Sequence, residues 1–300
     1  MNFPNLRRSV MLLVMLGGGA AASAVEAAKL PVTTGLPPVA YLAAAVGGDR
    51  VSVESMLPEG RTPHDFTPRT QAVRQAAQAK IFFTTGQTFE RKIAGFLSGG
   101  ARICDVTAGI RRIPFSAGEE KEHGHDHGNH HHHDDEADPH VWLSAKNAAI
   151  MADNIASALA AIDPDGAETY RRNCAALKRE LDRLDRDIRR DLAPFAGRTF
   201  FVYHPAFGYF AADYKLRQRA VELNGREAGA AQLAAIIREA RDARAATVFV
   251  QKQFNPRTAK ALADRIGGTV AELDPLAYDL PDNLRRTADA LRRGFLCERK

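Results

Sequence analysis

Eight of the ten histidines in this 300-residue chain lie between residues 123 and 140, in the run HGHDHGNHHHHDDEADPH. Imidazole and carboxylate groups together bind divalent transition metals. The run has almost no apolar residues to build a core, so we expect a mobile loop over residues 119–137. It predicts low-affinity accessory metal binding by His123, His125, His127, His130, His131, His132 and His133. The alternative is a solvated polar loop with no metal role.

A second group of potential ligands is scattered along the chain but shares one setting. His64 follows a predicted strand over 50–57, and His204 follows one over 199–203. His140 stands just before a helix that Ser144 caps, and Asp274 follows a predicted strand over 269–273. Ligands of open α/β sheets bind beyond the carboxyl ends of strands, so these four side chains could meet.

The chemistry of these four residues suits a tetrahedral or distorted zinc site. Three imidazoles and one carboxylate are a ligand set that Zn²⁺ accepts. A proline stands beside each of Asp274 and the three histidines, and its fixed φ restrains the ligand before metal arrives. Taken singly, each histidine is better explained as a hydrogen-bonded core or surface residue. Their shared placement favours a site.

Strands alternate with helices in two groups, which predicts two α/β lobes with parallel sheets. The first group has helices over 36–48 and 67–79 and strands over 50–57, 81–84 and 103–106. The second has strands over 199–203, 247–250 and 269–273 and helices over 230–244 and 255–266.

Between the two groups lies the longest periodic segment. Its apolar residues step by four, three, four, three and four, at Tyr170, Cys174, Leu177, Leu181, Leu184 and Ile188. This stripe predicts one rigid helix over residues 164–193 that packs on both lobes. A coiled-coil dimer is the rival interpretation, but fewer than three heptads are short for one. The predicted lobes then span residues 25–163 and 194–300.

The N-terminus predicts a secretory signal peptide over residues 1–24. Arg7 and Arg8 precede an apolar stretch over 10–16, and Ala22-Ser23-Ala24 is a small-x-small cleavage site. No cysteine follows this site closely, so we expect no lipid anchor, and no later stretch is long and apolar enough to span a membrane. The three cysteines, Cys104, Cys174 and Cys297, form no C-x-x-C signature. We expect buried free thiols, with one disulfide pair left open.

Several function classes lack support in the sequence. The net charge is +5, but residues 171–190 mix both signs, which is typical of a solvated helix face and not of a nucleic-acid surface. The chain has no G-x-S-x-G elbow, phosphate-binding glycine loop or H-E-x-x-H motif. We therefore expect a binding protein and not an enzyme.

Five motifs together resemble the zinc-uptake, ZnuA-type solute-binding proteins of bacterial ABC transporters, within the cluster A-I family. They are TPHDF at 62–66, DPHVW at 138–142, YHPAFGYF at 203–210, VQKQF at 250–254 and LDPL at 273–276. The resemblance implies two α/β lobes joined by one long helix, with the metal in the cleft between them. It implies His64, His140 and His204 as ligands, with Asp274 as the fourth or an adjacent one. In some relatives the fourth position is water or a loop carboxylate.

The resemblance implies a monomeric periplasmic protein that binds Zn²⁺ tightly and delivers it to the membrane permease of an ABC transporter. Manganese-selective relatives typically have a carboxylate where this chain has His204, so a manganese or iron carrier is the alternative within the family. A secreted zinc hydrolase, with Asp65 or Asp274 as general base, and a surface adhesin are alternatives outside it. With unperturbed histidine pKa values near 6.5, zinc affinity should fall below about pH 6.

Overall fold

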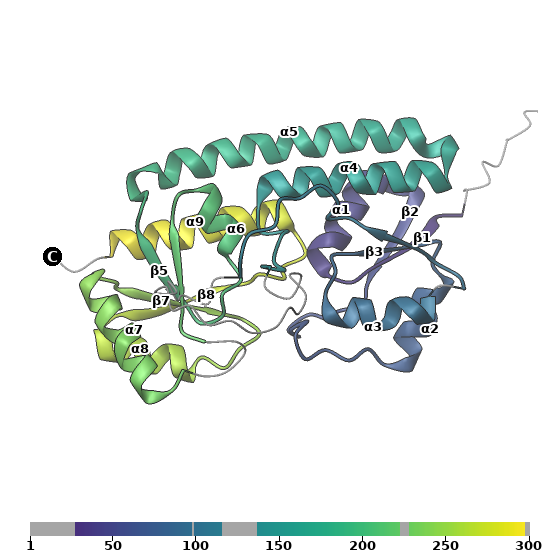
Figure 1. The fold of residues 1–300 in the computed structure, drawn as a ribbon. Helices are drawn as coiled ribbons and strands as arrows, with labels where there is room; N and C mark the ends of the chain where they lie inside the picture. Colours follow the sequence, from purple (N-terminus) through teal and green to yellow (C-terminus); the bar gives the residue numbers. More distant parts are fainter. Residues whose placement is uncertain (1–27, 98, 116–136, 223–227, 298–300) are drawn as a thin grey trace, which may run out of the picture.

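The first lobe is built on a four-stranded parallel sheet with the strand order β2-β1-β3-β4 (Figure 1). The computed structural model describes residues 28–97, 99–115, 137–222 and 228–297. The expected signal peptide and the seven accessory histidines lie outside these residues. The strands are β1 (Leu30–Thr34), β2 (Val51–Ser55), β3 (Ile81–Thr84) and β4 (Arg102–Asp105).

Helices cover both faces of this sheet, so the inner residues of its central strands are buried. The helices α1 (Pro37–Gly47) and α4 (Ala145–Ile162) lie on one face, and α2 (Thr70–Gln78) and α3 (Thr88–Leu97) lie on the other (Figure 1). All three apolar residues of β3, Ile81, Phe82 and Phe83, are fully buried. Ser144 caps α4, as expected, and its hydroxyl accepts a hydrogen bond from the Asn147 amide.

The second lobe repeats this arrangement with the strand order β6-β5-β7-β8, again all parallel. Its strands are β5 (Thr199–Val202), β6 (Arg217–Ala220), β7 (Thr247–Gln251) and β8 (Thr269–Leu273). The helices α7 (Ala230–Asp242) and α8 (Arg257–Ile266) cover one face, while α9 (Leu280–Leu296) covers the other (Figure 1). The short helix α6 (Gly208–Asp213) follows β5.

The long helix α5 (Ala167–Leu192) runs across both lobes, with one 3₁₀ turn at each end, Pro164–Gly166 and Ala193–Phe195 (Figure 1). It packs against α1 and α4 of the first lobe and against α9 of the second. Every residue of its apolar stripe is at most 4% exposed within this one chain. The stripe is therefore already covered without a partner, and the coiled-coil interpretation loses its basis.

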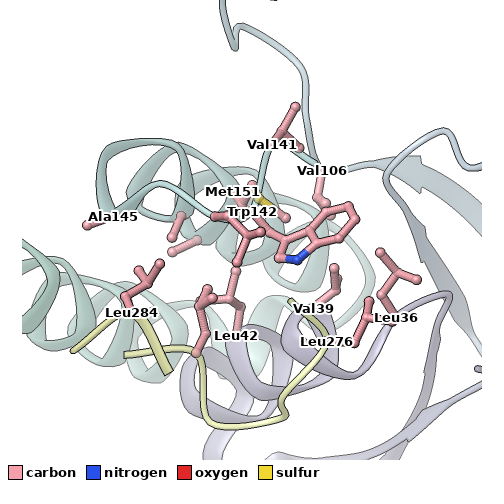
Figure 2. Packing of buried hydrophobic residues seen from close by; sticks show 14 of the residues in the cluster. Leu36, Val39, Leu42, Val106, Val141, Trp142, Ala145, Met151, Leu276 and Leu284 are labelled. Atoms are coloured by element: carbon pink, nitrogen blue, oxygen red, sulfur yellow. The ribbon is translucent and has the colours of Figure 1, made fainter. Parts of the chain in front are cut away.

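The apolar core is continuous between the lobes around Trp142. Figure 2 shows its indole beside Leu36 and Val39 of the first lobe and Leu276 of the second. Trp142 is fully buried, and its Nε1 donates a hydrogen bond to the carbonyl of Pro275 over 2.7 Å. Since an apolar seam and a buried hydrogen bond join the lobes here, the first few residues after His140 also fix where the second lobe sits.

The cysteines depart in part from the expectation of buried thiols. All three are free, but only Cys174 is buried; Cys104 is half-buried and Cys297 is exposed. Cys297 lies immediately after α9, where the apolar face of that helix ends. The expectation was wrong for Cys297 because its position beyond the last turn takes it out of the core.

Candidate metal centre

Three histidines from three separate loops converge at the boundary between the lobes. His64 lies in the loop between β2 and α2, His140 in the loop that leads into α4, and His204 in the loop after β5. One ring nitrogen from each lies within 4.8 Å of the others. The Nε2 atom of His204 is 3.0 Å from Nε2 of His64 and 3.3 Å from Nε2 of His140. The structure thus brings together all three histidines that the sequence predicted as ligands.

Carboxylates contact the outward-facing nitrogens of two of these rings. Asp138 Oδ1 is 2.8 Å from Nδ1 of His140, and Glu222 Oε1 is 3.2 Å from Nδ1 of His204. All four of these side chains are buried. A carboxylate accepts a hydrogen bond from Nδ1–H, which leaves the Nε2 lone pair of that ring free to bind a metal. With the proton on Nδ1, each of these two rings presents Nε2 to a metal.

The electrostatic surroundings keep the rings of His64 and His204 neutral. Loss of water around its ring, and then repulsion from His204 and His140, lowers the pKa of His64 to about 3. Part of the His64 residue is exposed, but its ring faces the other two histidines. Burial likewise lowers the pKa of His204, although its hydrogen bond to Glu222 opposes this shift. Neutral imidazole is the form that ligates metals, so the group fits a cation.

The backbone of each ligand loop is also restrained. The His204 amide donates to Gln251 Oε1 over 3.0 Å, and the Gln251 side-chain amide donates back to the His204 carbonyl. The ring of Phe254 stacks on the His204 imidazole, with centroids 5.1 Å apart. The His140 amide donates to Asp138 Oδ1 over 2.9 Å. These contacts hold the imidazoles in place before a metal binds, which lowers the entropy cost of binding.

A family model described as ZnuA, the periplasmic component A of a zinc-uptake complex, matches residues 32–294. The chain belongs to the ZnuA family. A crystal structure of ZnuA superimposes with a TM-score of 0.80 at 31% identity, covering 89% of this chain and 99% of that one.

Two relatives are similar to this chain over more than four fifths of its length. The zinc-binding lipoprotein AdcA of Streptococcus pneumoniae (strain TIGR4) is 31% identical over 252 residues, which are 83% of this chain and 50% of AdcA. This chain therefore spans about half the length of AdcA. A Treponema pallidum (strain Nichols) protein, named only as metal-binding, is 30% identical over 252 residues, covering 81% of this chain and 78% of that protein. Among the described residues of the ZnuA-family chain, no helix is long and apolar enough to cross a membrane.

The structure does not place Asp274 of the ZnuA-family chain in the group of three histidines. Its Oδ1 instead accepts hydrogen bonds from Gln253 Nε2 over 2.8 Å and from the Leu276 amide over 3.0 Å. Asp274 lines a neighbouring cavity of about 500 Å³ that residues from both lobes enclose. The proline-flanked loop after β8 places the carboxylate near the site, as expected, but points it at the amide of Gln253.

Four further residues of the ZnuA-family site were not assigned a role from the sequence. Asp138 precedes His140 within the DPHVW motif, so its proximity could have suggested the contact. Gln251 and Phe254 lie in the VQKQF motif at the end of a predicted strand. Glu222 carried no sequence signal, because the strand before it, β6, reads RQRA and lacks an apolar run.

Proposed function

We propose that this ZnuA-family protein binds Zn²⁺ with high affinity outside the cytoplasm, in the periplasm, and delivers it to the permease of an ABC transporter. His64, His140 and His204 are the metal ligands in this proposal. The observation that carries it is the convergence of three Nε2 atoms, two of them on rings whose Nδ1 contacts a buried carboxylate. The family description and the name of the AdcA relative both refer to zinc. A cleaved leader over residues 1–24 and a monomeric state complete the proposal.

Zinc is favoured over manganese by the type of ligand atom. Manganese prefers oxygen ligands, whereas imidazole nitrogen suits zinc, copper, iron and nickel. Among the residues that the structure describes, three nitrogens and no carboxylate oxygen form the group. Two buried carboxylates lie directly behind these rings, so they add negative charge without occupying metal positions. A manganese or iron carrier remains the alternative, and direct competition between the ions tests it.

A binding role also fits the cavity better than zinc hydrolysis does. The space that the three histidines line is only about 10 Å³, which is close to the minimum for one water molecule. This volume gives no room for a peptide or ester chain against the three histidines. Asp274, one of the two candidate general bases, accepts two hydrogen bonds from its own lobe.

We further propose that metal release involves local loop movement and not a wide opening of the lobes. The helix α5 packs on both lobes, the core around Trp142 is continuous, and Lys252 Nζ contacts Glu59 Oε1 across the boundary over 2.7 Å. Solution scattering with and without zinc should give nearly the same radius of gyration. A large change on metal binding would contradict this part of the proposal.

Calorimetry on the untagged protein, with native mass spectrometry to identify and count the bound ions, tests the proposal. Wild type should bind zinc at one tight site. His64→Ala, His140→Ala and His204→Ala should each weaken that site by more than the roughly 10–100-fold typical of losing an outer-shell partner. His123→Ala is the matched control and should leave it unchanged. Tight binding that survives all three ligand substitutions would refute the proposed site.

A further inference from the structure

Gln253 occupies the wall between two cavities. It lines the small space around the three histidines and also the neighbouring cavity of about 500 Å³. The next residue, Phe254, stacks on His204. Gln253 therefore lies next to the metal-binding group, although its amide is not one of the usual zinc ligands.

The orientation of the Gln253 amide is determined by Asp274. Gln253 Nε2 donates to Asp274 Oδ1 over 2.8 Å, and a carboxylate oxygen can only accept. Two hydrogen bonds hold Asp274 itself in place. The Asp274 carbonyl accepts one from Asn283 Nδ2 over 2.6 Å, and Asp274 Oδ1 accepts another from the Leu276 amide. The nitrogen end of the Gln253 amide thus faces Asp274, and the oxygen end faces away from it.

The oxygen end is buried and lacks a partner. Gln253 Oε1 has no hydrogen-bond partner anywhere in residues 28–97, 99–115, 137–222 and 228–297. A buried acceptor left without a donor costs roughly 1–3 kcal/mol, so native proteins rarely keep one without a use. Three histidines leave one position of a tetrahedral zinc ion for another ligand. Gln253 and the three histidines line the same small space.

We propose that Gln253 Oε1 accepts a hydrogen bond from a water molecule that serves as the fourth zinc ligand, and that Asp274 acts on the site only through Gln253. This inference rests on the proposed function. In it Gln253 is a positioning residue, and Asp274 is the residue that orients it. A neutral fourth ligand exchanges more readily than a carboxylate would, because it carries no charge to hold the cation. That suits a protein that must give its metal up.

The test uses cobalt in place of zinc, since the visible spectrum of Co²⁺ reports its ligands. Water on a zinc-like ion held by three histidines ionises near pH 7. The spectrum of Co²⁺-loaded wild type should therefore change with pH through one ionisation. An acceptor such as Gln253 Oε1 favours water over hydroxide, so Gln253→Leu should lower that apparent pKa by roughly half to one unit. The same variant should weaken zinc binding by roughly 10–100-fold.

Three controls separate this role from a purely structural one. Gln75→Leu, on the exposed surface of α2, should change neither the cobalt titration nor zinc affinity. The melting temperature of metal-free Gln253→Leu should stay close to that of wild type, because the substitution removes an unsatisfied buried oxygen together with one hydrogen bond to Asp274. Asp274→Asn keeps an oxygen acceptor but removes its charge, and should shift the cobalt titration in the same direction by less. If Gln253→Leu folds poorly, the cobalt titration of Asp274→Asn tests the inference in its place.

Two results would overturn the inference. A cobalt spectrum of wild type that stays constant from pH 6 to pH 10 would mean that no water is bound, as expected for a carboxylate ligand. A Gln253→Leu protein with the wild-type titration and zinc affinity would show that the amide has no part in the site. Failure of the proposed function would give a different result. Wild type would then bind neither zinc nor cobalt tightly, or His204→Ala would bind zinc as tightly as wild type does.

Discussion

Glu222 Oε1 lies 3.2 Å from Nδ1 of His204, while Nε2 of the same ring lies 3.0 Å from His64. The imidazole thus has a buried carboxylate on one side and the metal-binding group on the other. This contact raises the pKa of His204 against the opposing effect of burial. It also keeps the Nδ1 proton in place, so the ring binds a metal through Nε2.

Glu222→Gln should therefore weaken zinc binding by roughly 10–100-fold. The amide can still accept a hydrogen bond from Nδ1, but it removes the negative charge that strengthens His204 as a ligand. Competition with a chromogenic chelator measures the loss. The matched control is Glu239→Gln on the surface of α7, where the carboxylate contacts Arg219. Equal affinities for wild type and Glu222→Gln would show that this contact does not tune the metal site.

Zinc affinity should persist to lower pH than unperturbed histidines allow. One unit below its pKa, a free imidazole is about 90% protonated, so three ordinary ligands would lose about 1,000-fold in affinity at pH 5.5. The pKa of His64 is lowered to about 3 and that of His204 is also lowered, so protons compete less. We expect less than about a 30-fold loss between pH 7.5 and pH 5.5. The sequence-based expectation of a decline below about pH 6 moves to more acidic values.

The lowered pKa values of His64 and His204 also predict how the stability of the metal-free protein changes in acid. A lowered folded-state pKa means that the unfolded chain binds more protons as the pH falls below about 6.5. Stability is therefore highest above that value and declines as the pH falls toward the folded-state pKa. Thermal unfolding at pH 7 and pH 4.5 should show a smaller loss for His64→Gln than for wild type. A larger loss in the variant would contradict the lowered pKa of His64.

Replacing residues 119–136 with a short glycine-serine linker should leave the tight zinc site intact. The two flanks of this segment already meet, because Pro114 and Ala137 form an antiparallel bridge and the Asp138 amide donates to the Ile113 carbonyl over 2.9 Å. Calorimetry should show the same tight site, with fewer weakly bound ions at high zinc concentration. Loss of tight binding in this variant would mean that the histidine-rich segment contributes to the main site.

Leu181→Ala should destabilise the metal-free protein by roughly 2–5 kcal/mol, because it leaves a cavity under α5. Leu181 is 1% exposed and lies in the middle of the helix that packs on both lobes. Urea unfolding measures the change in the free energy of unfolding. Arg183→Ala, two residues away on the exposed face, should change it by no more than about 0.5 kcal/mol. Similar values for the two variants would argue against α5 as a rigid connection.

Local pattern was sufficient for most of the elements that carry the site. The apolar run of β3, the alternation in β8 and the stripe of α5 each predicted the right element, because hydrophobic periodicity reflects which face is buried. Two strands were missed. The strand β1 reads LPVTT and β6 reads RQRA, so neither shows an apolar run, and both form through pairing with neighbouring strands.

The sequence by itself determined which three histidines are available, since each stands beside a proline near the end of a predicted element. Only the tertiary structure decided that their Nε2 atoms meet, that Asp138 and Glu222 lie behind two of the rings, and that Asp274 turns to Gln253 instead. The reason is physical. Residue type and local periodicity are properties of neighbours in the chain, whereas ligand geometry and pKa depend on contacts between segments up to 140 residues apart.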